Sequence, residues 1–130
     1  MSQPKMNDAD YALLADFRPT LRTFMAFSET QARSVGLTPQ QHQALLTIRG
    51  TALGNATVGY VAERLMLKPH SASGLLSRLE EAGFVLRESD PTDQRTTFMP
   101  LTVDAEALMA SLSLPHPAEL SHLTPLLLSM

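Results

Sequence analysis

The sequence predicts a mainly α-helical domain with one small β-hairpin. Three observations support this fold class. Apolar residues recur at spacings of three and four over most of the 130 residues. Helix-capping residues interrupt that pattern at intervals. One stretch of alternating and β-branched residues is divided by the turn-forming run "DPTD". The length suits one domain, residues 1–130, with one hydrophobic core.

The first predicted element is a helix over residues 8–35. Pro19 lies inside its apolar pattern. An interior proline costs about 3 kcal/mol, so we expect a kink there or a helix start near residues 19–20. Gly36 is the candidate C-cap. The apolar residues that carry the pattern are Leu13, Leu14, Phe17, Leu21, Phe24 and Met25.

A second helix is predicted over residues 39–50. Thr38 suits the N-cap, and Pro39 suits the first helical position, where its missing N–H is no loss. This helix should bury Ala44, Leu45 and Ile48, and Gly50 should end it.

A short strand and two more helices follow. Thr57 and Val58 are expected to form a very short strand. The amphipathic run "VGYVAERLMLK" is expected to form a helix. The "KP" pair should end this helix, because a residue before proline avoids the helical region. The next helix, residues 70–83, should be closed by Gly83. Its expected buried stripe is Ala72, Leu75, Leu76 and Leu79.

Residues 84–88 and 96–101 read as the two strands of a hairpin. A helix capped by Thr102 should follow and be cut short by Pro115. A last apolar helix is expected after Pro117. Its leucines need a partner to cover them: Leu120, Leu123, Leu126, Leu127 and Leu128.

The charge of the chain is uneven. The net charge is −3, which argues weakly against a nucleic-acid partner. Every Lys and Arg lies at or before Arg95, so any polyanion should contact the middle of the chain. The chain has no cysteine, which excludes disulfides and thiolate metal sites and fits a cytoplasmic protein. No secretory signal or membrane span is expected.

Two short helices followed by a hairpin form the layout of a winged helix-turn-helix, whose second helix enters the DNA major groove. The polar face of the helix at 70–83 carries small hydrogen-bonding side chains and no acid between residues 70 and 79. Such a face can approach bases and phosphates; the alternative is a serine-rich face toward solvent. The candidate DNA-binding residues there are His70, Ser71, Ser73, Gly74, Ser77 and Arg78.

The loop of the hairpin, residues 89–96, contains Asp93 and Arg95. An arginine at such a tip can insert into a narrow minor groove, where the potential is most negative. Asp93 can orient its guanidinium through a charge-assisted contact. The alternative is an ordinary surface turn with an ion pair of about 0–1 kcal/mol.

The runs "LTPQQHQALL" and "TVGYVAERLMLKPHSASGLLSRLEEAGFVLRESDPTDQRTTFMPLT" resemble the MarR family of bacterial winged-helix transcriptional regulators. The resemblance covers roughly residues 10–125, and "D-P-x-D-x-R" is the family's wing signature. It implies a DNA-binding core at 38–102 and dimerisation helices at 8–35 and 103–130. By resemblance, Lys68 and His70 flank the recognition helix at 70–83, and Arg95 reaches the minor groove.

The resemblance also implies partners: double-stranded DNA with a pseudo-palindromic operator, a second copy of the chain, and a small-molecule effector. The effector would bind in a cleft between the dimerisation helices and the DNA-binding core, above the helix at 39–50. The sequence contains no glycine-rich phosphate loop, nucleophile elbow or His–Glu zinc motif, so no cofactor, metal or catalytic residue is expected. His42 is a conceivable ligand or metal residue, although a core or interface histidine is the stronger expectation. The chain departs from its family in charge, because residues 59–95 carry a net charge of −1. DNA affinity should therefore be modest and salt-dependent; the alternative function is a winged-helix protein-interaction module that no longer binds DNA.

Overall fold

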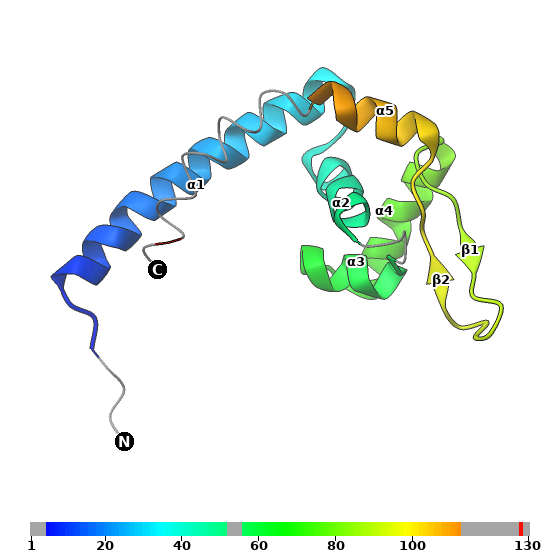
Figure 1. The fold of residues 1–130 in the computed structure, drawn as a ribbon, viewed down its shortest axis with the longest axis horizontal. Coiled ribbons are helices and arrows are strands. Elements are labelled where there is room, and N and C mark those ends of the chain that lie inside the picture. Colours follow the sequence, from blue (N-terminus) through cyan, green and yellow to red (C-terminus); the bar gives the residue numbers. More distant parts are fainter. Residues whose placement is uncertain (1–4, 52–55, 113–127, 129–130) are drawn as a thin grey trace.

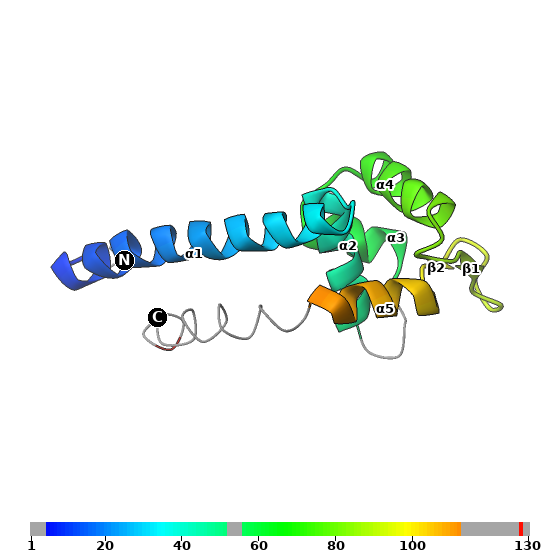
Figure 2. The ribbon, with the colours of Figure 1, turned by 90° about the horizontal axis from the view of Figure 1, so that it is seen from above.

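The computed structural model describes residues 5–51, 56–112 and 128. Within these residues α1 is a long rod, and α2 to α5 gather with the hairpin at its C-terminal end (Figure 1). Figure 2 shows the same separation from a second direction, with the hairpin at the end of the molecule far from the start of α1. The elements are α1 (Asp8–Ser34), α2 (Pro39–Gly50), α3 (Val58–Leu65), α4 (Pro69–Glu81), β1 (Glu88–Ser89), β2 (Thr97–Phe98) and α5 (Val103–Leu112).

Helix α1 begins well before its proline. Asn7 caps it: the Asp10 N–H donates to Asn7 Oδ1 at 2.9 Å, and the Asn7 N–H donates to Asp10 Oδ2 at 3.0 Å. This reciprocal capping box satisfies two N–H groups that a helix start otherwise leaves unpaired. The helix continues through Pro19, so the expected start near residues 19–20 is wrong. The cap fixes the start, and the chain accepts one proline inside a helix of 27 residues.

Helix α1 ends in a left-handed turn. The C-cap is Val35, and Gly36 follows it with φ +79°. The Leu37 N–H donates to Ala32 O and the Gly36 N–H to Arg33 O, each at 3.0 Å. This is the Schellman pattern, in which glycine is favoured just beyond the cap. Gly36 therefore closes the helix, one position later than its predicted role as the C-cap.

Helix α2 has the predicted bounds. Thr38 Oγ1 accepts from the Gln41 N–H at 3.1 Å, and the Gln41 side chain accepts from the Thr38 N–H at 3.0 Å. Pro39 occupies the first turn. The predicted buried residues Ala44, Leu45 and Ile48 are buried.

The strand expected at residues 57–58 is reduced to one bridge. Thr57 bridges to Phe98 and also caps α3, because its Oγ1 accepts from the Tyr60 N–H at 3.0 Å. Val58 is already helical. Helix α3 ends at Leu65, before the "KP" pair that was expected to end it, since Met66 takes a left-handed conformation with φ +56°.

Helix α4 begins and ends slightly earlier than the predicted 70–83. Pro69 is its first residue, Ala82 is the C-cap, and Gly83 follows with φ +84°. The predicted stripe is buried: Ala72, Leu75, Leu76 and Leu79. The helix packs against α2 and α3, and the three leucines of the stripe belong to a core that also takes in residues from the hairpin and α5.

The hairpin has less regular pairing than predicted. Strands β1 and β2 pair antiparallel, with Glu88 opposite Phe98 and Ser89 opposite Thr97. Nearer the core the two segments are joined by a bridge between Val85 and Leu101, and the Thr102 N–H donates to Phe84 O at 3.0 Å. The physical reason is Pro100, which accepts from the Leu86 N–H at 2.9 Å but has no N–H to return.

Thr102 joins the hairpin to the last described helix. Its Oγ1 donates to Gly83 O at 2.7 Å and accepts from the Ala105 N–H at 3.2 Å, which confirms it as the cap of α5. The break at Pro115 and the apolar helix expected after Pro117 fall outside the described residues, except that Leu128 is helical and exposed.

Gly83 is expected to be sensitive to substitution, because its φ of +84° lies in the left-handed region. Nothing lies within 4 Å of a Cβ built there, so the cost of Gly83→Ala is conformational. We expect a loss of about 1 kcal/mol in unfolding free energy, measured by chemical denaturation. The control is Gly74→Ala, at a helical position with equally open space, which should stabilise the protein by up to about 1 kcal/mol. Equal stability of the two variants would contradict the argument.

Candidate nucleic-acid interface

Helix α4 carries most of the predicted DNA-binding residues on its polar side. Lys68 is the N-cap and makes no side-chain capping bond. The helix buries one stripe and leaves the opposite side for the predicted set. Of that set, Lys68, His70, Ser71 and Arg78 are exposed, and Ser73, Gly74 and Ser77 are half-buried.

Ser77 is held from the hairpin side by an arginine. The Arg87 Nη2 donates to Ser77 Oγ at 2.8 Å, and Arg87 Nε donates to Glu80 Oε1 at 3.0 Å. One guanidinium therefore bridges two residues of α4 that lie about one turn apart. The bridge joins the candidate recognition helix to the base of the hairpin.

Arg87 is not among the DNA-binding residues predicted from the sequence. A signal for it exists in the sequence, because side chains two apart on an extended segment point to the same face. Val85 is buried in the core, so residue 87 should point to the same side, toward α4. An arginine there, opposite Glu80 and a serine-rich helix, is the pattern that could have identified it.

The wing loop, residues 90–96, is organised by two aspartates. Asp90 Oδ1 accepts from the Thr92 N–H at 2.9 Å and from Thr92 Oγ1 at 2.8 Å. Asp93 Oδ1 accepts from the Arg95 N–H, and Asp93 Oδ2 accepts from Thr96 Oγ1, both at 3.1 Å. Aspartates that bond the backbone two residues on build turns of this kind. The loop thus has a defined shape before any partner is present.

The Thr92 backbone N–H, followed by its hydroxyl, lowers the pKa of Asp90 from its ordinary value of 3.8. The folded pKa is therefore the lower one. The contribution of this carboxylate to the order of the loop is complete above pH 3.8 and is lost as the pH falls through the folded value.

Arg95 lies beyond this framework. Its side chain is 95% exposed, and its Nε is 3.5 Å from Asp93 Oδ1. An ion pair so exposed adds at most about 1 kcal/mol to stability. Its geometric effect is to restrain an otherwise free guanidinium that projects from the loop.

His42 lies in the core. It is 2% exposed, within the buried side of α2, which agrees with its expected role as a core histidine. Within residues 5–51, 56–112 and 128, no group of three or more His, Cys, Asp or Glu could hold a metal ion. In the same part of the chain, none of the helices combines the length and apolar character that crossing a bilayer requires.

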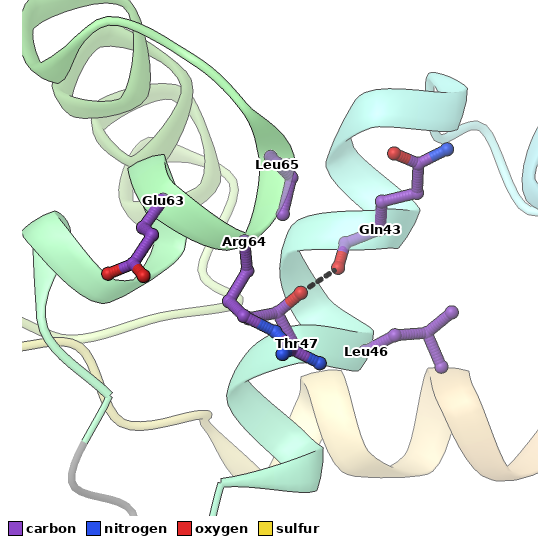
Figure 3. Close-up of a pocket in the computed structure, with 6 residues that line it drawn as sticks. All are labelled: Gln43, Leu46, Thr47, Glu63, Arg64 and Leu65. Atoms are coloured by element: carbon purple, nitrogen blue, oxygen red, sulfur yellow. Dashed lines mark hydrogen bonds between the residues drawn. The ribbon is translucent and has the colours of Figure 1, made fainter. Parts of the chain in front are cut away.

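A separate pocket of about 460 Å³ lies between α2 and α3. Figure 3 shows the six residues around it, with the hydrogen bond from Thr47 Oγ1 to Gln43 O at 2.9 Å. None of the predicted DNA-binding residues lines it, and neither does His42. The lining residues are Gln43, Leu46, Thr47, Glu63, Arg64 and Leu65.

The chain is similar to known transcriptional regulators in the region that forms this interface. The model of the MarR family matches residues 35–96, from the end of α1 to the end of the wing loop. The chain is similar to YcgE, an uncharacterized HTH-type transcriptional regulator of Bacillus subtilis (strain 168), with 32% identity over 87 residues. That match covers 66% of this chain but 55% of YcgE, so the chain spans little more than half of that relative.

Solved structures share the fold. The MarR family transcription regulator SP03579 superposes with a TM-score of 0.72 at 25% identity, covering 91% of this chain and 77% of that one. A mutant of MepR from S. aureus, solved bound to an oligodeoxyribonucleotide, has a TM-score of 0.66 at 19% identity, covering 97% and 85%. These likenesses confirm the predicted winged-helix fold.

Proposed function

The chain belongs to the MarR family, and from that premise we propose that it is a homodimeric, sequence-specific DNA-binding transcriptional regulator. The relatives named above are transcriptional regulators rather than enzymes. Each subunit would place α4 in a major groove and the wing loop in the neighbouring minor groove. Such a protein acts in the bacterial cytoplasm, where its DNA lies.

One observation carries the proposal. A helix whose outward side has no acid between residues 70 and 79 is followed by an ordered loop that presents Arg95 at 95% exposure. A small polar face can approach base edges, and a projecting arginine suits a narrow minor groove. MepR, which shares the fold, was solved bound to an oligodeoxyribonucleotide, which supports DNA as the partner class. The proposed contacts are Lys68, His70, Ser71, Ser73, Gly74, Ser77, Arg78 and Arg95, with Asp93 orienting Arg95.

The shape of α1 supports the proposed homodimer. Its buried residues, Ser28 and Ala32, lie near its C-terminal end. The earlier part of the rod leaves Tyr11 and Leu21 exposed and lies apart from α2 to α5 (Figures 1 and 2). A second copy of the chain would cover this surface. Two-fold symmetry then predicts a pseudo-palindromic operator with half-sites about one helical turn apart.

Regulation by a small molecule is the remaining part of the proposal. A ligand that favours one separation of the two DNA-binding cores would change DNA affinity by population shift. The pocket between α2 and α3 is one place for such a ligand, and it differs from the cleft beside the dimerisation helices that the family resemblance suggested. A repressor released by its ligand is the form that we propose.

One observation favours a second candidate function. Residues 59–95 carry a net charge of −1, which suits a winged helix that binds another protein better than it suits a strong DNA binder. A heparin column at low salt separates the two. Retention and salt elution support a DNA-binding surface, and passage without retention supports the interaction module.

The decisive experiment is fluorescence anisotropy with duplexes that tile the DNA upstream of the protein's own gene. At about 50 mM salt we expect saturable binding to one tile, and at about 200 mM a steep loss, because phosphate contacts release counterions. Binding that survives competitor DNA supports the regulator. Absence of binding to every tile and to random duplex at the lower salt overturns the proposal in favour of the interaction module.

A further inference from the structure

The contact between Arg87 and Ser77 holds α4 against the hairpin and also sets the direction of the Ser77 hydroxyl. Arg87 Nη2 lies 2.8 Å from Ser77 Oγ, so the arginine is the donor and the serine oxygen the acceptor. The Arg87 Nε to Glu80 Oε1 bond, at 3.0 Å, holds the guanidinium in place for this contact. The side chains of Arg87 and Glu80 are 32% and 40% exposed, so both remain near the surface that would face DNA.

This contact decides the direction of the serine hydroxyl. A hydroxyl has one O–H to donate and lone pairs to accept with, and it rotates to suit its partners. When a cation donates to the oxygen, the O–H must point away from the guanidinium. The positive charge of the Arg87 guanidinium also strengthens the hydrogen bond that the Ser77 O–H can donate to a DNA acceptor, because linked hydrogen bonds polarise one another. An amino group of a DNA base that approached Ser77 Oγ as a second donor would be repelled by the positive charge of Arg87.

We propose that Arg87 is a positioning residue that commits the Ser77 hydroxyl to donating toward DNA, so that position 77 selects a hydrogen-bond acceptor. The acceptor is a purine N7, guanine O6 or thymine O4 on a base edge, or a phosphate oxygen. The amino groups of adenine and cytosine are disfavoured there. This inference rests on the proposed DNA-binding function and adds the chemistry that one position of it recognises.

The surroundings of Ser77 leave room for such a contact. Ser73 and Gly74 precede it by four and three residues and therefore lie on the same side of α4. Both are small, and nothing lies within 4 Å of a Cβ built at Gly74. A DNA edge can therefore approach Ser77 without a bulky side chain between them.

The test removes acceptors from DNA one at a time. The probe is the duplex that the wild-type protein selects from a randomised library, remade with single modified nucleotides. Substitution with 7-deazapurine removes N7, 2-aminopurine removes guanine O6, 5-methyl-2-pyrimidinone removes thymine O4, and a methylphosphonate replaces a phosphate oxygen. One modification should weaken wild-type binding about three- to tenfold, the loss of one hydrogen bond, while Ser77→Ala is insensitive to it. If a base analogue has this effect, Ser77 contacts a base edge. If the methylphosphonate has it, Ser77 contacts a phosphate.

The role of Arg87 is tested in a variant that keeps the serine. Arg87→Met is combined with Glu80→Gln, so that no unpaired carboxylate is left beside the DNA. We expect this protein to lose most of its sensitivity to the same modification, although its hydroxyl is present. Arg33→Met, which removes an exposed arginine at the end of α1, should keep the wild-type sensitivity. A role of Arg87 in stability alone would lower the melting temperature and leave the sensitivity unchanged.

The outcomes distinguish this inference from the proposed function. Wild-type protein that selects no DNA overturns both. Wild-type protein that selects a duplex, with sensitivity that survives in the Arg87→Met/Glu80→Gln protein, overturns the inference and leaves the function standing. The same holds if wild type and Ser77→Ala respond equally to every modification.

Discussion

Replacing Arg95 with alanine is expected to lower DNA affinity about 10- to 100-fold without unfolding the protein. The side chain is 95% exposed, and it pairs with Asp93 at 3.5 Å, so the folded state loses almost nothing. In the proposed dimer, two arginines leave the complex, and a net loss of about 1 kcal/mol for each corresponds to about 2 kcal/mol in total, or roughly 30-fold in affinity. The loss should be similar for many DNA sequences, because a minor-groove arginine responds to groove width more than to base identity.

The salt dependence separates a DNA contact from a general loss of charge. The slope of log affinity against log salt should fall by about one for each phosphate contact removed. Arg33→Ala is the matched control, because it removes an exposed arginine at the end of α1 and should leave both affinity and slope unchanged. Arg95→Ala protein with wild-type affinity would make residues 90–96 an ordinary surface turn.

Elements defined by neighbouring residues could be predicted from the sequence. Helix α2 has the predicted bounds because its cap, Thr38 with Gln41, and its Pro39 all lie within the first turn. Helix α4 is shifted by one or two residues, since Gly83 fixes its end locally. Capping is short-range chemistry, so one sequence contains nearly all of the information that it needs.

The two errors have different causes. Pro19 suggested a break, although the capping box of Asn7 with Asp10, which is itself a local signal, already fixes the helix start. The strands of the hairpin were predicted too long because Pro100 interrupts the pairing opposite Leu86. Only this second error requires knowledge of a strand partner that residue propensities do not provide.

The candidate site follows the same rule. Serines on the polar side of α4 and the Asp93–Arg95 pair could be chosen from composition and spacing within single segments. Arg87 is harder to choose, because its role depends on a contact with Ser77, ten residues away on another element. Its spacing from Val85 indicates which way the side chain should point, but the fold is needed to show which residues of α4 it meets.

Replacing Ser73 with glutamate is expected to reduce DNA binding at least 100-fold. Ser73 is half-buried on the acid-free side of α4, so a carboxylate there would face phosphates and base edges, and like charges at an interface cost several kcal/mol. The change should not unfold the helix, because glutamate has a higher helix propensity than serine. Anisotropy titration of the duplex that wild type selects measures the affinity, and circular dichroism checks the fold.

Ser73→Gln is the matched control for charge. Glutamine has nearly the size of glutamate and no charge, so it reports the steric part of the effect alone. We expect Ser73→Gln to retain clearly more affinity than Ser73→Glu, with a gap that narrows as salt rises, since screening weakens repulsion between charges. Equal losses would mean that bulk, rather than charge, excludes DNA. No loss in either variant would remove α4 from the interface, because a face pressed into a major groove cannot accept a larger side chain at its centre without a change in affinity.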